Sequence, residues 1–126
     1  MRVFKTRVFD RWAGKVGVTD TALLKAVADA ERGLIDADLG GNLFKQRIAL
    51  HGRGKSGSAR TLLATRFADT LYFLFGFEKS DRANITRRER AIYQSLAGNL
   101  LALSHDQIET ALKVNELVEV QHEPND

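Results

Sequence analysis

The chain has 126 residues, no cysteine and a formal net charge of +3 at neutral pH. This length predicts a single domain over residues 1–126, and the lack of cysteine excludes disulfides and thiolate metal sites. No apolar run approaches the roughly 20 residues of a membrane span, and charged residues interrupt the N-terminus where a signal peptide would be apolar. We therefore expect a soluble, cytoplasmic protein with no membrane partner.

The first third of the chain predicts a short strand followed by two helices. Residues 2–5 read as the strand. Apolar side chains at positions 9, 12, 13 and 16 mark one face of the first helix. Thr6 is a suitable N-cap for that helix, and Gly17 follows its end. The second helix is expected from Asp20 to Arg32, and residues 39–42 are expected to form a turn.

The middle of the chain predicts three consecutive antiparallel strands. In the first, residues 43–50, the positions of Phe44 and Ile48 alternate with those of Lys45 and Arg47. Because alternate residues of a strand point to opposite faces, one face is expected to join a core and the other to present cations. Residues 59–67 and 71–77 are the next two strands, and the second of these is apolar on both faces.

The last third predicts helices and a short strand. The T-x-x-E pattern at Thr86 and the S-x-x-Q pattern at Ser104 are capping boxes that open two helices. Residues 117–121 are a candidate terminal strand. The complete pattern predicts an α+β domain, with a small antiparallel sheet, two N-terminal helices packed on one sheet face, and C-terminal helices.

Charge is distributed unevenly along the chain. Residues 39–68 contain six Lys or Arg and no acid, whereas residues 101–126 contain six acids and one lysine. Residues 51–58 form a glycine- and serine-rich segment whose backbone N–H groups can approach an anion closely. A basic middle beside such a loop predicts a site for phosphate, as in a polyanion.

No cofactor or metal is expected, because the three histidines are isolated and no paired-carboxylate or Walker spacing occurs. Cations and hydroxyls can still promote attack of a ribose 2′-OH on the adjacent phosphate, by positioning and by stabilising the phosphorane. The same residues can also bind RNA without cutting it. Residue types alone favour binding over catalysis.

Three blocks of the chain resemble the RelE/HigB-type toxins of bacterial type II toxin–antitoxin modules. They are GGNLFKQRI (residues 40–48), GRGKSGSART (52–61) and FGFEKSDRANI (75–85). The resemblance runs from about Arg2 to Leu103 and leaves residues 104–126 as an extension. It implies a RelE-like fold, metal-independent mRNA cleavage at the ribosome, and silencing by a cognate antitoxin that often carries a helix-turn-helix domain.

The resemblance also implies roles for individual residues. Arg60 matches the arginine that contacts the scissile phosphate, and Lys45 and Arg47 match basic residues of the catalytic strand. Ser80 and Thr86 stand where relatives place a catalytic arginine and a catalytic tyrosine. The expected catalytic residues are Arg60, Lys55, Lys45 and Arg47, and the expected RNA-binding residues are Arg53, His51, Lys79 and Arg82.

Three functions therefore remain open. The first is a ribosome-dependent endoribonuclease toxin that inhibits translation, with Lys55 and His51 as replacements for the missing catalytic groups. The second is a module that binds RNA or the ribosome without cleavage, and the third is a ParE-like inhibitor of gyrase on the same fold.

Arg60 is expected near the start of its strand with no role in the core.

Overall fold

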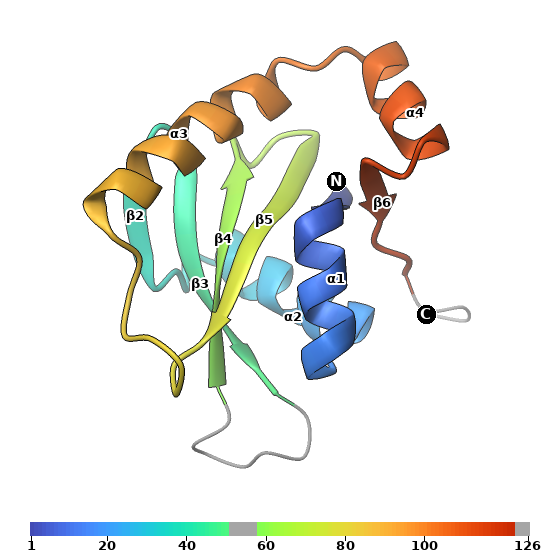
Figure 1. Ribbon diagram of the computed structural model, residues 1–126. Coiled ribbons are helices and arrows are strands. Elements are labelled where there is room, and N and C mark those ends of the chain that lie inside the picture. Colours follow the sequence, from blue (N-terminus) through green and yellow to red (C-terminus); the bar gives the residue numbers. More distant parts are fainter. Residues whose placement is uncertain (51–57, 123–126) are drawn as a thin grey trace.

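The computed structural model describes residues 1–50 and 58–122. In this part of the chain, four helices pack against one six-stranded sheet with the strand order β2-β3-β4-β5-β1-β6 (Figure 1). Neighbouring strands are antiparallel except β1 and β5, which run parallel. The elements in chain order are β1 (Arg2–Thr6), α1 (Arg7–Val16), α2 (Asp20–Glu31), β2 (Ala37–Gly40), β3 (Leu43–Ala49), β4 (Ser58–Thr65), β5 (Thr70–Glu78), α3 (Arg87–Leu101), α4 (His105–Lys113) and β6 (Leu117–Glu119).

Each face of the sheet has its own apolar core. On one face, Phe9 of α1 and Leu23 of α2 pack with Phe73 and Ile48 of the sheet. The other face carries a second core, to which α3 contributes Ala97 and α4 contributes Ile108. The predicted α+β class, with the two N-terminal helices on one face, is confirmed, and the C-terminal helices cover part of the opposite face.

Helix boundaries follow the local signals in the sequence. The Thr6 hydroxyl accepts a hydrogen bond from the Phe9 N–H at 3.2 Å, and Gly17 ends α1 in the left-handed region at φ 84°. Thr86 and Ser104 both form complete capping boxes at the starts of α3 and α4. These caps satisfy N–H groups that have no partner inside a helix, which is why their spacing alone located the helix starts.

One strand was not predicted. Residues 37–40 form β2, which pairs with the first half of β3. It is only four residues long and contains Asp38 and Gly40, two residue types that are depleted in strands, and the following Gly41 and Asn42 adopt left-handed φ angles of 65° and 63°. The turn expected at 39–42 is therefore the tip of a hairpin. The Leu39 carbonyl accepts hydrogen bonds from Arg90 and Gln94 of α3, which connects this hairpin to the helix above it.

Trp12 is packed closely against the central strand. A Cβ atom added at Gly76 of β5 would lie 2.3 Å from the Trp12 ring. Glycine is therefore required here by the approach of the indole and not by its own backbone angles. This contact holds α1 against the strand that ends beside the candidate site.

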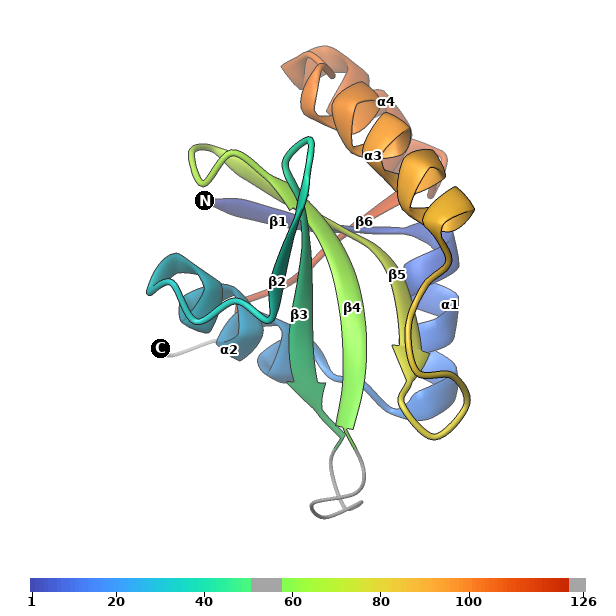
Figure 2. The ribbon, with the colours of Figure 1, turned by 90° about the vertical axis from the view of Figure 1, so that its left-hand side faces the viewer.

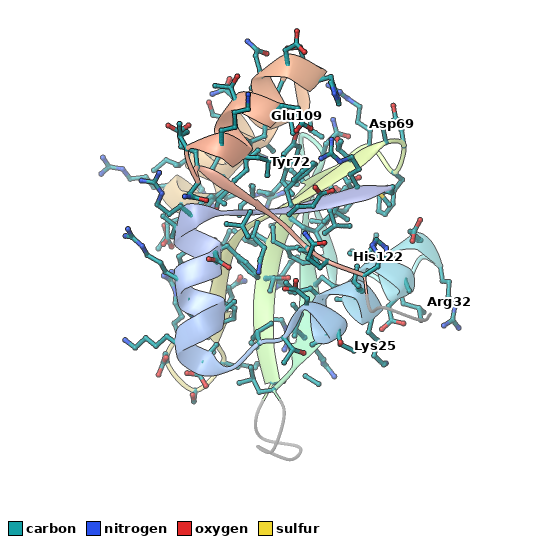
Figure 3. The ribbon with its side chains drawn as sticks, turned by 90° about the vertical axis from the view of Figure 1, so that its right-hand side faces the viewer. Lys25, Arg32, Asp69, Tyr72, Glu109 and His122 are labelled. Carbon is teal, nitrogen blue, oxygen red and sulfur yellow. The ribbon has the colours of Figure 1, made fainter. Side chains whose placement is uncertain are left out.

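The segment after Leu103 belongs to the same sheet. Strand β6 pairs with β1, in agreement with the predicted terminal strand. The Arg2 guanidinium bonds to Glu119 of β6 at 2.9 Å and to Glu109 of α4 at 3.0 Å. These bonds raise the pKa of Arg2 and lower the pKa of Glu119. Figure 3 views this side of the molecule and labels Glu109 on α4 and Tyr72 on the sheet below it.

Among the described residues, no helix is both long and apolar enough to cross a membrane.

Candidate functional site

Three cations lie on one face of neighbouring strands. Lys45 and Arg47 of β3 alternate with residues that point to the α2 side, and Arg47 is the cross-strand partner of Arg60 on β4. Arg60 therefore shares their face, which is the α3 side of the sheet. We call Lys45, Arg47 and Arg60 the basic sheet face. Figure 2 shows that α3 crosses the upper end of this side and leaves the lower ends of β3 and β4 uncovered by helix.

Arg60 is the most buried member of the basic sheet face. It is only 6% exposed. Its Nε donates to Asp36 Oδ2 at 3.1 Å, and its Nη1 makes longer contacts with the Ser58 hydroxyl at 3.4 Å and the Ala59 carbonyl at 3.5 Å. The expectation that Arg60 has no role in the core was wrong, because the side chain is buried and ion-paired. It failed because its acidic partner comes from a different part of the chain.

Asp36 is the residue that the sequence reasoning missed. It lies in the connection between α2 and β2, and its Oδ2 is also 3.8 Å from Lys45 Nζ. The window of residues 39–68, which holds no acid, begins just after it. Sequence patterns gave no signal for it, because strand β2, whose pairing with Lys45 brings the carboxylate to the edge of the basic sheet face, was not predicted.

Arg47 differs from its two neighbours because it is exposed. Lys45 is intermediate, with a side chain 17% exposed. The basic sheet face thus runs from a buried arginine to an accessible one within a single cross-strand pair. An extended polyanion could contact Arg47 from solvent and reach inward to Arg60.

A second pair of predicted cations borders the site. Residues 79–86, between β5 and α3, run beside the lower ends of β4 and β5 on the α3 side (Figure 2). Lys79 is exposed, but Arg82 is half-buried and forms two hydrogen bonds to Glu89, one of them 3.0 Å long. The bond from Arg82 is the main reason that the pKa of Glu89 falls to about 2. Arg82 therefore stays charged, with Glu89 as its counter-charge.

Aromatic rings connect this border to the basic sheet face. Phe77 is the cross-strand partner of Arg60, and the Arg82 guanidinium lies 5.7 Å from the centre of its ring. Phe75 stacks on Tyr93 of α3 at 5.1 Å. Burial raises the pKa of Tyr93 above its ordinary value of 10.0. Tyr72 is buried, as expected of a core residue.

Three predicted site residues lie outside the described residues. They are His51, Arg53 and Lys55.

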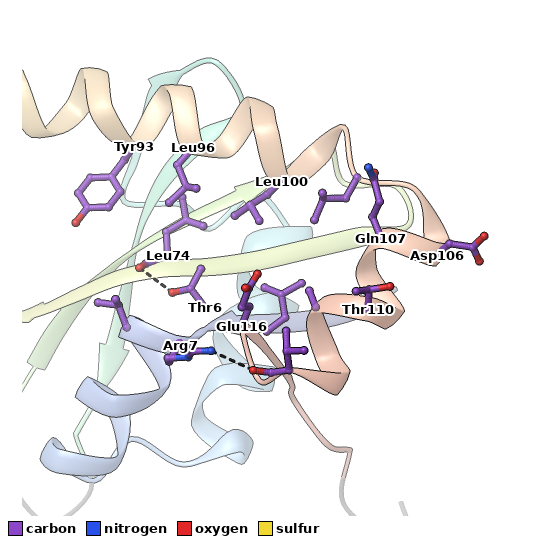
Figure 4. A pocket seen from close by; sticks show the side chains of 15 residues that line it. Thr6, Arg7, Leu74, Tyr93, Leu96, Leu100, Asp106, Gln107, Thr110 and Glu116 are labelled. Carbon is purple, nitrogen blue, oxygen red and sulfur yellow. Dashed lines mark hydrogen bonds between the residues drawn. The ribbon is translucent and has the colours of Figure 1, made fainter.

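A large hollow in the described part of the chain lies elsewhere. It is an apolar groove of about 1040 Å³ between α3, α4 and the start of α1, with Leu74, Leu96 and Leu100 in its lining (Figure 4). Its charged lining residues are Arg7, Asp106 and Glu116, and no member of the basic sheet face lines it. A mainly apolar groove with two acids and one cation in its lining is less suited to a phosphate chain than the basic sheet face is. The polyanion chemistry therefore belongs to the basic sheet face.

Metal-ligating side chains do not gather anywhere in residues 1–50 and 58–122, where no group of three or more His, Cys, Asp or Glu is placed to hold an ion. The basic sheet face instead offers guanidinium and ammonium groups with one carboxylate. These can bind phosphate oxygens and stabilise negative charge that develops on them.

The fold and the site together define a small α+β domain with a six-stranded sheet and a cationic sheet face. The family model described as the RelE toxin of the RelE / RelB toxin–antitoxin system matches residues 1–120. The chain therefore belongs to the RelE toxin family, and it is a toxin that has a cognate antitoxin as its partner. Among curated proteins no match was found. The matched region includes α4 and β6, beyond the point where the sequence resemblance had ended.

Proposed function

We propose that this toxin is a ribosome-dependent endoribonuclease of the RelE/HigB type, which cleaves mRNA and so inhibits translation. The observation that carries the proposal is the basic sheet face, where Arg47, Lys45 and Arg60 lie on the same face of two paired strands and Arg47 is exposed. A ribosomal target places its action in the cytoplasm.

The proposed reaction uses the RNA's own 2′-OH as nucleophile. The 2′-oxygen loses its proton and attacks the adjacent phosphorus, and the bond from phosphorus to the 5′-oxygen breaks. The leaving 5′-oxygen takes a proton. The products are a 2′,3′-cyclic phosphate and a 5′-hydroxyl, and no redox step or metal is required.

The roles of the residues follow from their exposure and chemistry. Arg60 is held in place and has a planar fork that binds two phosphate oxygens, so it stabilises the phosphorane. Lys45 adds positive charge beside it, and the exposed Arg47 contacts the RNA backbone. Lys55 is proposed as a catalytic cation. The proposed contacts to flanking RNA are Arg53, His51, Lys79 and Arg82.

The antitoxin is proposed to be a helix-turn-helix protein that covers or distorts the basic sheet face in the resting cell. Co-expression of the toxin with the neighbouring small gene should then give a complex that purifies as one species. A complex in which Arg47 stays as accessible to modification as in the toxin alone would contradict this part of the proposal.

Primer extension on cellular mRNA after toxin induction tests the proposed function. The wild-type protein should create new, discrete 5′ ends, and Arg47→Ala should create far fewer. Lys15→Ala is the matched control, because Lys15 is an exposed cation on α1, which packs on the opposite sheet face. Arrested protein synthesis without new 5′ ends would indicate RNA or ribosome binding alone. Altered DNA supercoiling with intact mRNA would indicate gyrase inhibition.

A further inference from the structure

A single carboxylate contacts two of the cations of the basic sheet face. Asp36 Oδ2 lies 3.1 Å from Arg60 Nε on β4 and 3.8 Å from Lys45 Nζ on β3. The two cations come from neighbouring strands, whereas Asp36 comes from the connection between α2 and β2. The three side chains thus meet from three separate segments of the chain.

The backbone fixes the position of Asp36. Its N–H donates to the Lys45 carbonyl at 3.1 Å, and the next residue, Ala37, is paired with Lys45 in the sheet. These backbone contacts fix the position of the carboxylate beside Lys45 of β3. The Asp36 side chain is 28% exposed and the Arg60 side chain only 7%, so the ion pair is shielded on the arginine side.

Arg60 needs such a partner for two reasons. Arg47 is directly opposite it on β3, and like charges in a cross-strand pair repel each other. A buried guanidinium without a counter-charge is also costly. The bond from Nε to Asp36 occupies one side of the guanidinium and restricts its plane. Within the described residues, Nη2 has no hydrogen-bond partner, so it is available to an incoming phosphate oxygen.

We propose that Asp36 is a positioning residue for the cleavage reaction, which orients the Arg60 guanidinium toward the scissile phosphate and offsets its repulsion from Arg47. This inference rests on the proposed function. Asp36 acts through Arg60, so its effect on the rate requires the arginine to be present.

A double-mutant cycle tests this dependence. Single-turnover cleavage is measured on mRNA-programmed ribosomes with the full-length wild-type protein, Asp36→Asn, Arg60→Ala and the double variant. Asp36→Asn keeps the shape of the side chain, and it should lower the rate about 10- to 100-fold, because small misplacements of a catalytic group cost this much. In the Arg60→Ala background the same substitution should change the rate by less than about threefold, since interacting residues are not additive.

Two controls separate positioning from a structural effect. Asp29→Asn on α2 removes a carboxylate whose nearest cations, Lys25 and Arg32, are 3.9 Å away, and it should leave the rate unchanged. Ribosome affinity should change little in Asp36→Asn, while the maximal rate falls. If Asp36→Asn fails to fold in thermal melts, Asp36→Glu keeps the charge and moves the carboxylate by one methylene, and it should be folded but slow.

The outcomes are distinguishable. A wild-type protein that does not cleave overturns the proposed function itself. A wild-type protein that cleaves, with Asp36→Asn equally fast, overturns the positioning role alone. An equal loss of rate from Asp36→Asn with and without Arg60 also overturns it, because the residue would then act independently of the arginine.

Discussion

Arg47 and Arg60 are cross-strand partners on the same face of the sheet, yet one is exposed and the other is almost fully buried. Arg60 lies on a strand that is paired on both sides and it bonds to Asp36, whereas Arg47 lies on β3 beyond the residues that β2 pairs with. Substitution of Arg47 is therefore expected to affect mainly function, whereas substitution of Arg60 is expected to affect both function and stability.

Arg60→Ala should reduce both stability and cleavage. Loss of the partly buried ion pair leaves Asp36 without its closest cation, which we expect to cost about 2–3 kcal/mol in the free energy of unfolding. Loss of a donor to the phosphorane should lower the cleavage rate about 100- to 1,000-fold. Urea unfolding and single-turnover cleavage measure the two effects. Arg60→Lys keeps the charge without the fork, so it should recover stability more than rate.

Arg47→Ala should reduce cleavage with almost no change in stability. An exposed strand residue typically alters the free energy of unfolding by less than about 0.5 kcal/mol. Loss of a phosphate contact should weaken RNA-dependent activity and lessen its dependence on salt concentration. The measurement is the cleavage rate over a range of salt concentrations, with Lys15→Ala as the control. A salt dependence identical to that of the wild type would contradict an RNA contact at Arg47.

Much of this fold was predictable from local patterns. The caps at Thr6, Thr86 and Ser104 depend on neighbours three residues away, so the sequence alone locates them. The opposite faces of Phe44 and Lys45 follow in the same way from the pleat of a strand.

The features that were missed depend on contacts between distant segments. Strand β2 is only four residues long, and its pairing with β3 is what defines it as a strand. The ion pair of Arg60 is with Asp36, 24 positions away in the chain. The partial neutralisation of the basic sheet face could therefore be found only once these segments were placed together.

Glu89 should titrate at unusually low pH. Its pKa is about 2 in the folded protein against an ordinary value of 4.5, chiefly because Arg82 donates to it. A lowered carboxylate pKa stabilises the fold above the unfolded-state pKa, and this contribution is lost as the pH falls from about 4.5 towards 2. NMR titration of the Glu89 carboxyl carbon measures the folded value.

Arg82→Ala should raise the pKa of Glu89 towards 4.5, while Thr86 still holds it somewhat below that value. Arg87→Ala is the control, because Arg87 is an exposed arginine in the first turn of the same helix, and it should leave the pKa near 2. A pKa that stays near 2 in Arg82→Ala would show that the ion pair is not its cause.

Gly76→Ala should destabilise the protein through Trp12. The added methyl would lie 2.3 Å from the indole ring, so either α1 or β5 must move. Overpacking of this kind costs about 1–3 kcal/mol. Gly98→Ala on α3 is the matched control, because nothing lies within 4 Å of its added methyl, and it should be neutral or stabilising. Equal melting temperatures for the two variants would contradict the close contact with Trp12.

The central claim is that the basic sheet face promotes attack by the 2′-OH of ribosome-bound mRNA. Its most direct test uses two mRNAs on programmed ribosomes, identical except for a single 2′-deoxy nucleotide at the mapped cut site. The account predicts that the wild-type toxin cleaves the all-ribose mRNA, leaving a 2′,3′-cyclic phosphate and a 5′-hydroxyl, and leaves the 2′-deoxy mRNA intact at that position. Cleavage of the 2′-deoxy mRNA at the same position and rate would contradict it.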